Sequence, residues 1–556
     1  MLQPKDIQTI VDAHDDYWDG RRADLRTMKR LYMTRFWQDN GVADNVLRTE
    51  VPKAYAVVES YLGSLYAKNP AVRVEPDLRD RGTPEVAQAT ANQFLLAIRN
   101  QLEDATRLAL IYPCAYLKLA PVESVDPLKR VSCAALPPWE VIVDATATSW
   151  EVQRWVGHVH LMPLAEAATR YSKAPEAFTG RVYTDWLDDT SRAMVGRPVA
   201  LGDVASNDVD KWVRIVEVYD LRDDKLLVWS PDFDAGKSFL FEGVTVQIGA
   251  LEETVDGQAP EAEFQHETTG IPYKTANGRP IVPIVPVYFA RDPDKPLRGY
   301  SLVERSRDQF RELNLIRTYQ AQGVRRMARQ WMVRAGFLSE DAAAKISQGL
   351  DGEFIEVDTQ PGQPLEGNMV PVPTAPIPGD IAAYALTVDG DIRDAGLLAP
   401  FTRGEVTKST ATEQNLLAAY TSSEIGRMAR IRDEAITSVA RVYNIMLSVV
   451  LGNDAEPLAL PNPVGPTILS ADDLTGDFGY WAVDAGTTPM SDLAKQQAFE
   501  RLTPLLLQVG ADPIRLLEEV VRVFQLPETL AQPAPMAEAP AETAPVPQSG
   551  PMPAGV

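Results

Sequence analysis

One stretch of the chain resembles a phosphate-binding loop, the sequence AGKS at residues 235–238, which follows the strand-like KLLVWS. A Walker loop needs a glycine separated by four residues from its Gly-Lys pair, because the backbone amides of the loop cradle the phosphates. Here Pro231 occupies that position and has no amide hydrogen to donate. The residues that follow, FLFEGVTV, have the composition of a strand, whereas a Walker loop is followed by a helix. The stretch therefore predicts a hairpin turn and no nucleotide site.

The chain contains 4 histidines and 2 cysteines, so few residues are candidates for histidine or cysteine chemistry. His158 and His160 would lie on one face of a strand, but two ligands do not make a metal site without a third or fourth. We interpret them as a polar strand face. Cys114 and Cys133 are in no CxxC or Cys/His pattern and are expected to be reduced core thiols. We predict no catalytic residue, no metal and no cofactor, and hence a protein that is not an enzyme.

The overall charge limits which partners the chain can have. It has 556 residues, with 77 Asp and Glu against 54 Lys and Arg, a formal net charge of -23. Such an excess argues against a tight general binder of nucleic acid, because phosphates are neutralised by clustered Lys and Arg, but it leaves loose DNA contact open. The N-terminus lacks a signal-peptide pattern, and the most apolar run, 280–290, is too short for a bilayer. We expect a soluble intracellular protein with no membrane partner.

Against this acidic background, the sequence GVRRMARQWMVR at 323–334 carries four arginines and no acidic residue. It lies at the end of a proline-free stretch, 301–332, whose apolar residues recur close to every 3.5 positions and predict a long helix. The apolar positions proposed to pack against a neighbouring subunit are Val303, Phe310, Leu313, Met327 and Trp331. The basic positions, Arg311, Arg325, Arg326 and Arg329, fall on the opposite side, and Arg334 follows them. The sequence thus predicts a helix with one packed face and one positive face.

The elements around this helix divide the chain into a mixed α+β part and a helical part. Residues 1–300 are predicted to be α+β, with a helix over 51–69, a strand over 71–75 and hairpins over 211–248. After the long helix come a Gly/Pro-rich module, a second helix, a loop, and a third helix of some forty residues that Thr410 and Glu413 begin with a capping box. A strand pair, TILS and then FGYWAV, follows. The expected ranges are 333–378 for the module, 379–394 for the second helix, 395–409 for the loop, 410–490 for the long helix and return strands, 491–526 for two amphipathic helices and 527–556 for a disordered Pro/Ala-rich tail.

Taken together, these features resemble the portal proteins of tailed double-stranded DNA bacteriophages over roughly residues 50–525. The resemblance rests on three stretches: VVESYLGSLYAKNPAVRVEP, PIVPIVPVYFARDPDKPLRGYSLVERSRDQFRELNLIRTYQ and PFTRGEVTKSTATEQNLLAAYTSSEIGRMARIRDEAI. It implies the portal fold, assembled as a ring of about twelve subunits at one vertex of the capsid. It also implies packaging and ejection of duplex DNA through the ring, with the major capsid protein, the terminase large subunit and head-tail adaptors as partners. The implied location is the virion, and the host cytoplasm during assembly.

The resemblance assigns a role to each range. Residues 1–300 would be the wing, 301–332 the first stem helix, 333–378 the clip and 379–394 the second stem helix. Residues 395–409 would be the tunnel loop, 410–490 the long wing helix with its return strands, and 491–526 the crown. On the tunnel loop, Arg403, Glu405 and Lys408 would be candidates for transient contact with DNA, or simply solvated charges.

The arginine-rich face has three possible partners in such a ring. These are carboxylates of the neighbouring subunit, an acidic surface of the capsid or an adaptor, and DNA. Two rival functions also stay open. A packaging enzyme such as a terminase would need a phosphate loop and a clustered acidic nuclease site, and a tail or baseplate protein would not need the helix, module, helix, loop and long-helix series.

Overall fold

The N-terminal helix α1 (Pro4–Tyr32) was not anticipated from the sequence and covers one face of the largest sheet. Its first turn is closed by a capping box, in which the backbone amide of Gln3 donates to Asp6 at 2.9 Å. Ile7 and Val11 are buried against Val159 and Val216 of the sheet. The computed structural model describes residues 2–37, 48–66, 69–77, 82–122, 124, 126–180, 182–185, 196–199, 211–242, 244–245, 267–268, 270–293, 297–329, 331–333, 340–341, 344, 369–371, 379–395, 411–452, 458–460 and 467–483.

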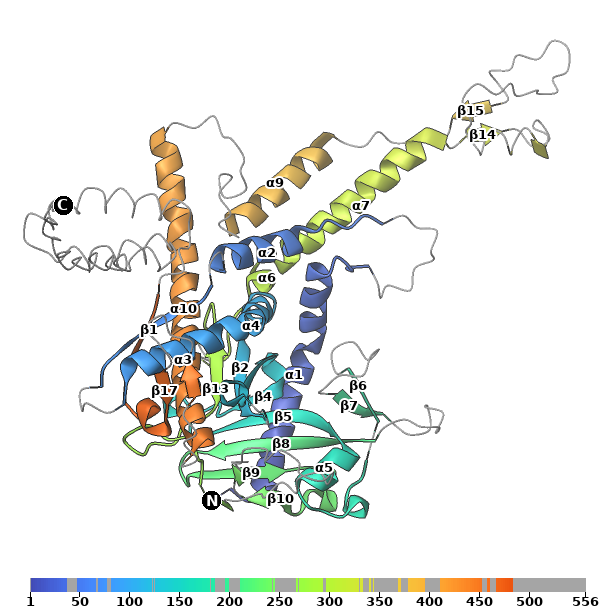
Figure 1. The fold of residues 1–556 in the computed structure, drawn as a ribbon. Coiled ribbons are helices and arrows are strands. Elements are labelled where there is room, and N and C mark those ends of the chain that lie inside the picture. The colour runs from blue at the N-terminus through green and yellow to red at the C-terminus, as the bar shows by residue number, and fades with distance from the viewer. Residues whose placement is uncertain are drawn as a thin grey trace, which may run out of the picture. The chain divides into compact units, whose positions relative to one another are not determined.

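Two antiparallel sheets, built from strands between Ala115 and Val287, make the fold mixed α+β as predicted (Figure 1). The larger has the order β10-β9-β8-β5-β4 and the smaller the order β13-β2-β3. The hairpins expected over 211–248 are confirmed in β8, β9 and β10. Part of the apolar run 280–290 forms β13, a strand at the edge of the smaller sheet. The bounds are β2 Ala115–Pro121, β3 Val131–Leu136, β4 Val141–Val143, β5 Trp155–Pro163, β8 Trp212–Asp220, β9 Lys225–Trp229, β10 Phe239–Glu242 and β13 Ile284–Val287.

The strand predicted at 71–75 is confirmed as β1 (Val72–Glu75), which alternates buried and exposed residues. Its partner is a surprise. We expected TILS and FGYWAV to pair with each other, but β18 (Gly479–Ala482) pairs with β1, and β17 (Thr467–Leu469) pairs with β16 (Leu458–Leu460). That prediction was wrong because neighbours in sequence were assumed to be neighbours in the sheet. Two further strand pairs are β6 (Val182–Asp185) with β7 (Gly196–Val199) and β11 (Val244–Thr245) with β12 (Glu267–Thr268).

Helices pack around the sheets and share one large apolar core with them. The longest is α10 (Ala411–Leu451), close to the range expected from the capping box. By length and composition, its part Ile425–Leu451 could cross a bilayer, but 61% of the most apolar window is buried inside the protein, which is typical of a core helix. Besides α1, the other helices of this core are α2 Lys53–Leu65, α3 Pro84–Ala97, α4 Arg99–Ile111, α6 Leu302–Arg305, α7 Arg307–Arg329 and α9 Gly379–Ala395, while α5 Leu164–Arg170 lies on the larger sheet.

Candidate functional site

The first long helix is shorter than predicted and is interrupted near its start. Ser301 caps the short α6 by accepting a hydrogen bond from the Glu304 amide at 2.8 Å, and Ser306 separates α6 from α7. At the other end α7 stops at Arg329, and Trp331 already belongs to a strand, β14 (Trp331–Val333). The predicted helix over 301–332 is therefore two helices followed by the start of a hairpin. Spacing alone could not distinguish a terminal turn of helix from the first residues of a strand.

One face of α7 is buried against the chain's own core. Val303 on α6 and Phe310 and Leu313 on α7 are each less than 5% exposed. We had expected them to pack against a neighbouring subunit, whereas they pack against elements of the same chain. Polar residues also lie on this face: Asn314 Oδ1 accepts from the Val51 amide at 2.8 Å, and Thr318 Oγ1 accepts from the Thr49 amide at 3.0 Å. Asn314 and Thr318 thus anchor the segment that leads into α2.

Helix α9 packs against α7 (Figure 1). It buries Ala385, Val388 and Ile392, which recur at helical spacing. Asp389 on the same helix forms an ion pair with Lys53 of α2 at 2.6 Å. It forms a second ion pair with Arg393, one turn later on α9. The predicted range of the second helix, 379–394, is confirmed to within one residue.

Three large apolar side chains are exposed on this helix pair. Leu386 is 70% exposed and Tyr384 50% exposed on α9, and Tyr319 is 63% exposed on α7. A leucine this exposed on a packed helix costs solvation free energy in an isolated chain. The side of α9 that carries Leu386 is therefore a candidate contact with another protein surface.

A segment separates α7 from α9 in sequence, and a strand near its start pairs with a strand near its end. Strand β14 pairs antiparallel with β15 (Met369–Pro371), with Trp331 opposite Pro371 and Val333 opposite Met369. Between the two strands, residues 340–341 and 344 are the only described positions. The Gly/Pro-rich module expected over 333–378 thus has its two ends joined, while most of it lies outside the described residues.

The structure places some of the predicted basic residues and leaves others undescribed. Arg311 is exposed on α7, opposite the buried face, as predicted. Arg325, Arg326, Met327 and Arg329 belong to α7, but their side chains, like that of Trp331, lie outside the described part of the chain. Arg334 and the loop residues Arg403, Glu405 and Lys408 also lie outside it, as do the ranges 491–526 and 527–556.

Charges at the start of the helix pair with α1 of the same chain. Arg21 donates to Glu304 at 2.6 Å, and Arg307 donates to Asp24 at 2.5 Å. In each pair one partner, Arg21 or Asp24, comes from α1, a helix that the sequence had not revealed. Such partly exposed pairs contribute modestly to stability and fix the position of α1 beside α6 and α7.

The residues first considered for chemistry behave mainly as structural groups. AGKS forms the predicted turn between β9 and β10, and Ala235 and Gly236 both adopt positive φ there. Both cysteines are free and buried, and burial raises the pKa of Cys114 to about 11 and of Cys133 to about 12. His158 and His160 are the exception, because Glu217 lies beside them as a third ligand-type side chain. The cross-strand partner of His158 was the signal that sequence reasoning missed.

Comparison with known proteins adds no assignment. No protein-family model matches the chain, and no curated protein matches it.

Proposed function

We propose that this chain is the portal protein of a tailed double-stranded DNA bacteriophage, a non-enzymatic ring at one vertex of the capsid. Duplex DNA passes through the ring during packaging and ejection. The ring docks the terminase, which supplies the energy, and afterwards the head-tail adaptors, while its outer surface meets the major capsid protein. In this proposal α7 and α9 are the stem, β14 and β15 begin and end the clip, and α10 is the long wing helix.

One observation carries the proposal: α7 leads into a hairpin, α9 packs back onto α7, and a 41-residue helix follows. The single chain leaves Leu386 on the surface of α9 70% exposed. In a ring, each copy can bury this surface against its neighbour, because a head-to-tail interface closes when the rotation between copies divides a full turn.

The charge of the chain supports the same role. Every phosphate that a channel neutralises adds salt-dependent affinity, so a strongly basic channel would hold the duplex in place. With a net charge of -23, a ring of such chains repels the duplex overall. The arginines of α7 and the predicted tunnel loop would then supply a limited number of transient contacts.

The decisive experiment is the mass and symmetry of the purified full-length protein, by native mass spectrometry and negative-stain class averages. We expect a closed ring of about twelve subunits with a central hole wide enough for a duplex. A monomer or dimer that persists at high concentration and at varied salt would refute the proposal. A ring without a central hole would favour a different structural protein of the virion.

A pair of variants tests whether the α7/α9 surface is the subunit interface. Leu386→Glu places a charge on the proposed interface and is expected to prevent ring formation while the monomer stays folded. Leu96→Glu is the matched control, since Leu96 is also an exposed leucine on a helix, α3, at 56% exposure. If both variants assemble normally, the interface lies elsewhere on the chain.

A further inference from the structure

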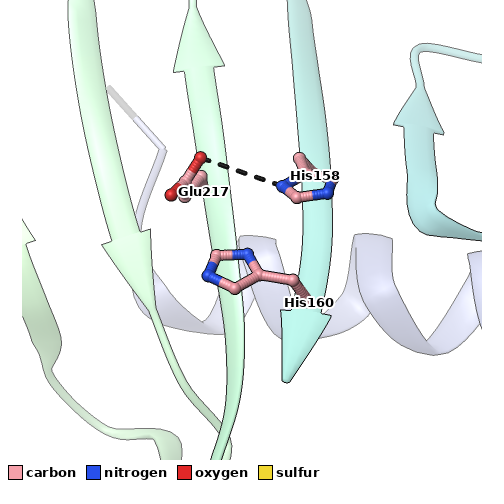
Figure 2. Close-up of side chains that lie close together, drawn as sticks. All are labelled: His158, His160 and Glu217. Atoms are coloured by element: carbon pink, nitrogen blue, oxygen red, sulfur yellow. Dashed lines mark ion pairs between the residues drawn. The ribbon is translucent and has the colours of Figure 1, made fainter. Parts of the chain in front are cut away.

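A cluster of two histidines and a glutamate lies on the larger sheet, apart from the helices assigned to the channel (Figure 2). His158 and His160 are on β5, and Glu217 is on β8 directly opposite His158 in the antiparallel register. Residues two apart on a strand point to the same side, so all three side chains project from one face. This face is opposite the one that α1 covers, since the intervening Val159 belongs to the same apolar cluster as Ile7 and Val11 of α1. The ligand atoms of the three residues lie within 4.8 Å of one another.

Both histidines are held in the form that binds metals. Burial lowers the pKa of His158 to about 4 and that of His160 to about 3, so each ring is neutral at pH 7. Burial raises the pKa of Glu217, but the ammonium of Lys118 and the two histidines together keep that pKa well below its usual value. Two neutral imidazoles and one carboxylate are a donor set for divalent transition metals, which leaves a further position for water.

The cluster also contains polar atoms that the protein does not satisfy. Nε2 of His158 and Nδ1 of His160 are buried without a hydrogen-bond partner in the described part of the chain. A buried ring nitrogen without a partner costs about 1–3 kcal/mol in protein mutants, so such atoms call for an explanation. A bound ion that recruits one of these nitrogens would provide it.

Lys118 shows that the cluster already attracts a cation. It extends from β2, donates to Glu217 and lies 2.8 Å from Nδ1 of His158, with 11% of its side chain exposed. An ammonium on a flexible four-carbon stem is a point charge that can be displaced, unlike the planar fork of an arginine. Lys118 and a metal ion would therefore compete for the same two acceptors.

We propose that His158, His160 and Glu217 form a binding site for one divalent transition-metal ion of the Zn²⁺ type, which displaces the Lys118 ammonium when it binds. The ion joins β5 to β8 through three side chains and holds the centre of the sheet. This site is independent of the channel function. Its ligands are two nitrogens and one oxygen, a set that favours Zn²⁺ or Co²⁺ over Mg²⁺ or Ca²⁺.

The test uses the full-length protein with Zn²⁺ in isothermal titration calorimetry and with Co²⁺ in visible absorption spectroscopy. We expect one saturable site per chain and Co²⁺ bands of a nitrogen- and oxygen-ligated ion. Lys118→Met removes the competing charge and is expected to tighten Zn²⁺ binding about tenfold or more. His160→Asn and Glu217→Gln are each expected to abolish the site.

The matched control is His14→Gln, because His14 is a buried histidine on α1 outside the cluster, with Nε2 at 2.9 Å from the carbonyl of Trp139. This variant is expected to bind Zn²⁺ as the parent does. The proposal is overturned if neither the parent nor Lys118→Met binds Zn²⁺ saturably at micromolar concentration. It is also overturned if His160→Asn and Glu217→Gln, shown to be folded by circular dichroism, bind as tightly as the parent. Because Lys118→Met predicts a gain of affinity, loss of fold cannot imitate the expected result.

Discussion

Replacing Arg432 with methionine is expected to loosen the contact between α10 and the end of α2. Arg432 is among the largest fully buried side chains, and its guanidinium donates to the backbone carbonyl of Leu65 and, at 2.6 and 2.9 Å, to Asp433. Leu65 is the last residue of α2, so its carbonyl has no partner within that helix. Arg432 therefore caps α2 from another helix, and its charge is favourable at the negative end of the helix dipole.

The expected change in the free energy of unfolding of Arg432→Met combines lost polar contacts with gained apolar burial. Removing the guanidinium leaves the Leu65 carbonyl buried without its donor, which costs about 1–3 kcal/mol, and loses the pair with Asp433, which is 27% exposed and can be hydrated. The methionine buries apolar surface and avoids the desolvation of a charge, which offsets part of the loss. The net change is a destabilisation of about 2 kcal/mol, which corresponds to roughly thirtyfold more frequent opening of the last turn of α2.

Hydrogen exchange measured by mass spectrometry reports this opening directly. The amide of Tyr66 donates to Leu62 at 3.0 Å, so peptides covering 60–66 are expected to exchange faster in Arg432→Met. Arg430→Met is the matched control, because Arg430 is exposed on the same helix. The reasoning is refuted if exchange at 60–66 is unchanged in Arg432→Met, or if that variant resists urea better than the parent.

Two further perturbations test the packing within residues 1–300. His14 is buried and its pKa is lowered from 6.5 to about 4 by burial, so the folded state takes up its proton later than the unfolded state as pH falls. The stability it contributes is complete above pH 6.5 and is lost as pH falls toward 4, by up to about 3 kcal/mol. His14→Gln should lose less stability than the parent between pH 7 and 4.5 in urea unfolding, and equal losses would contradict this. A Cβ at Gly299 would lie 1.8 Å from the Pro113 carbonyl oxygen, so Gly299→Ala is expected to cost about 3 kcal/mol or more. Gly20→Ala, with nothing within 4 Å of its new methyl group, should stabilise α1 by about 0.5–1 kcal/mol, and thermal melts that rank the two variants alike would refute the packing argument.

The sequence determined those elements whose pattern is local. Helix α9 begins and ends within one residue of its predicted range, and α10 begins within one residue of its predicted start, because apolar spacing and capping signatures depend on residues close together in sequence. The strand β1 was likewise visible in the alternation of Val72 and Val74 with charged residues. The buried, free state of Cys114 and Cys133 followed from their number and spacing.

Only the tertiary structure decided which distant segments meet. The pairing of β18 with β1 joins residues some four hundred positions apart, and no local pattern specifies such a partner. For the same reason, Glu217 and Lys118 could not be placed beside His158 from sequence, since they come from two other strands. Val303, Phe310 and Leu313 were expected at a subunit contact and lie in the chain's own core. Periodicity identifies an apolar face, but whether that face meets the same chain or another copy depends on the fold around it.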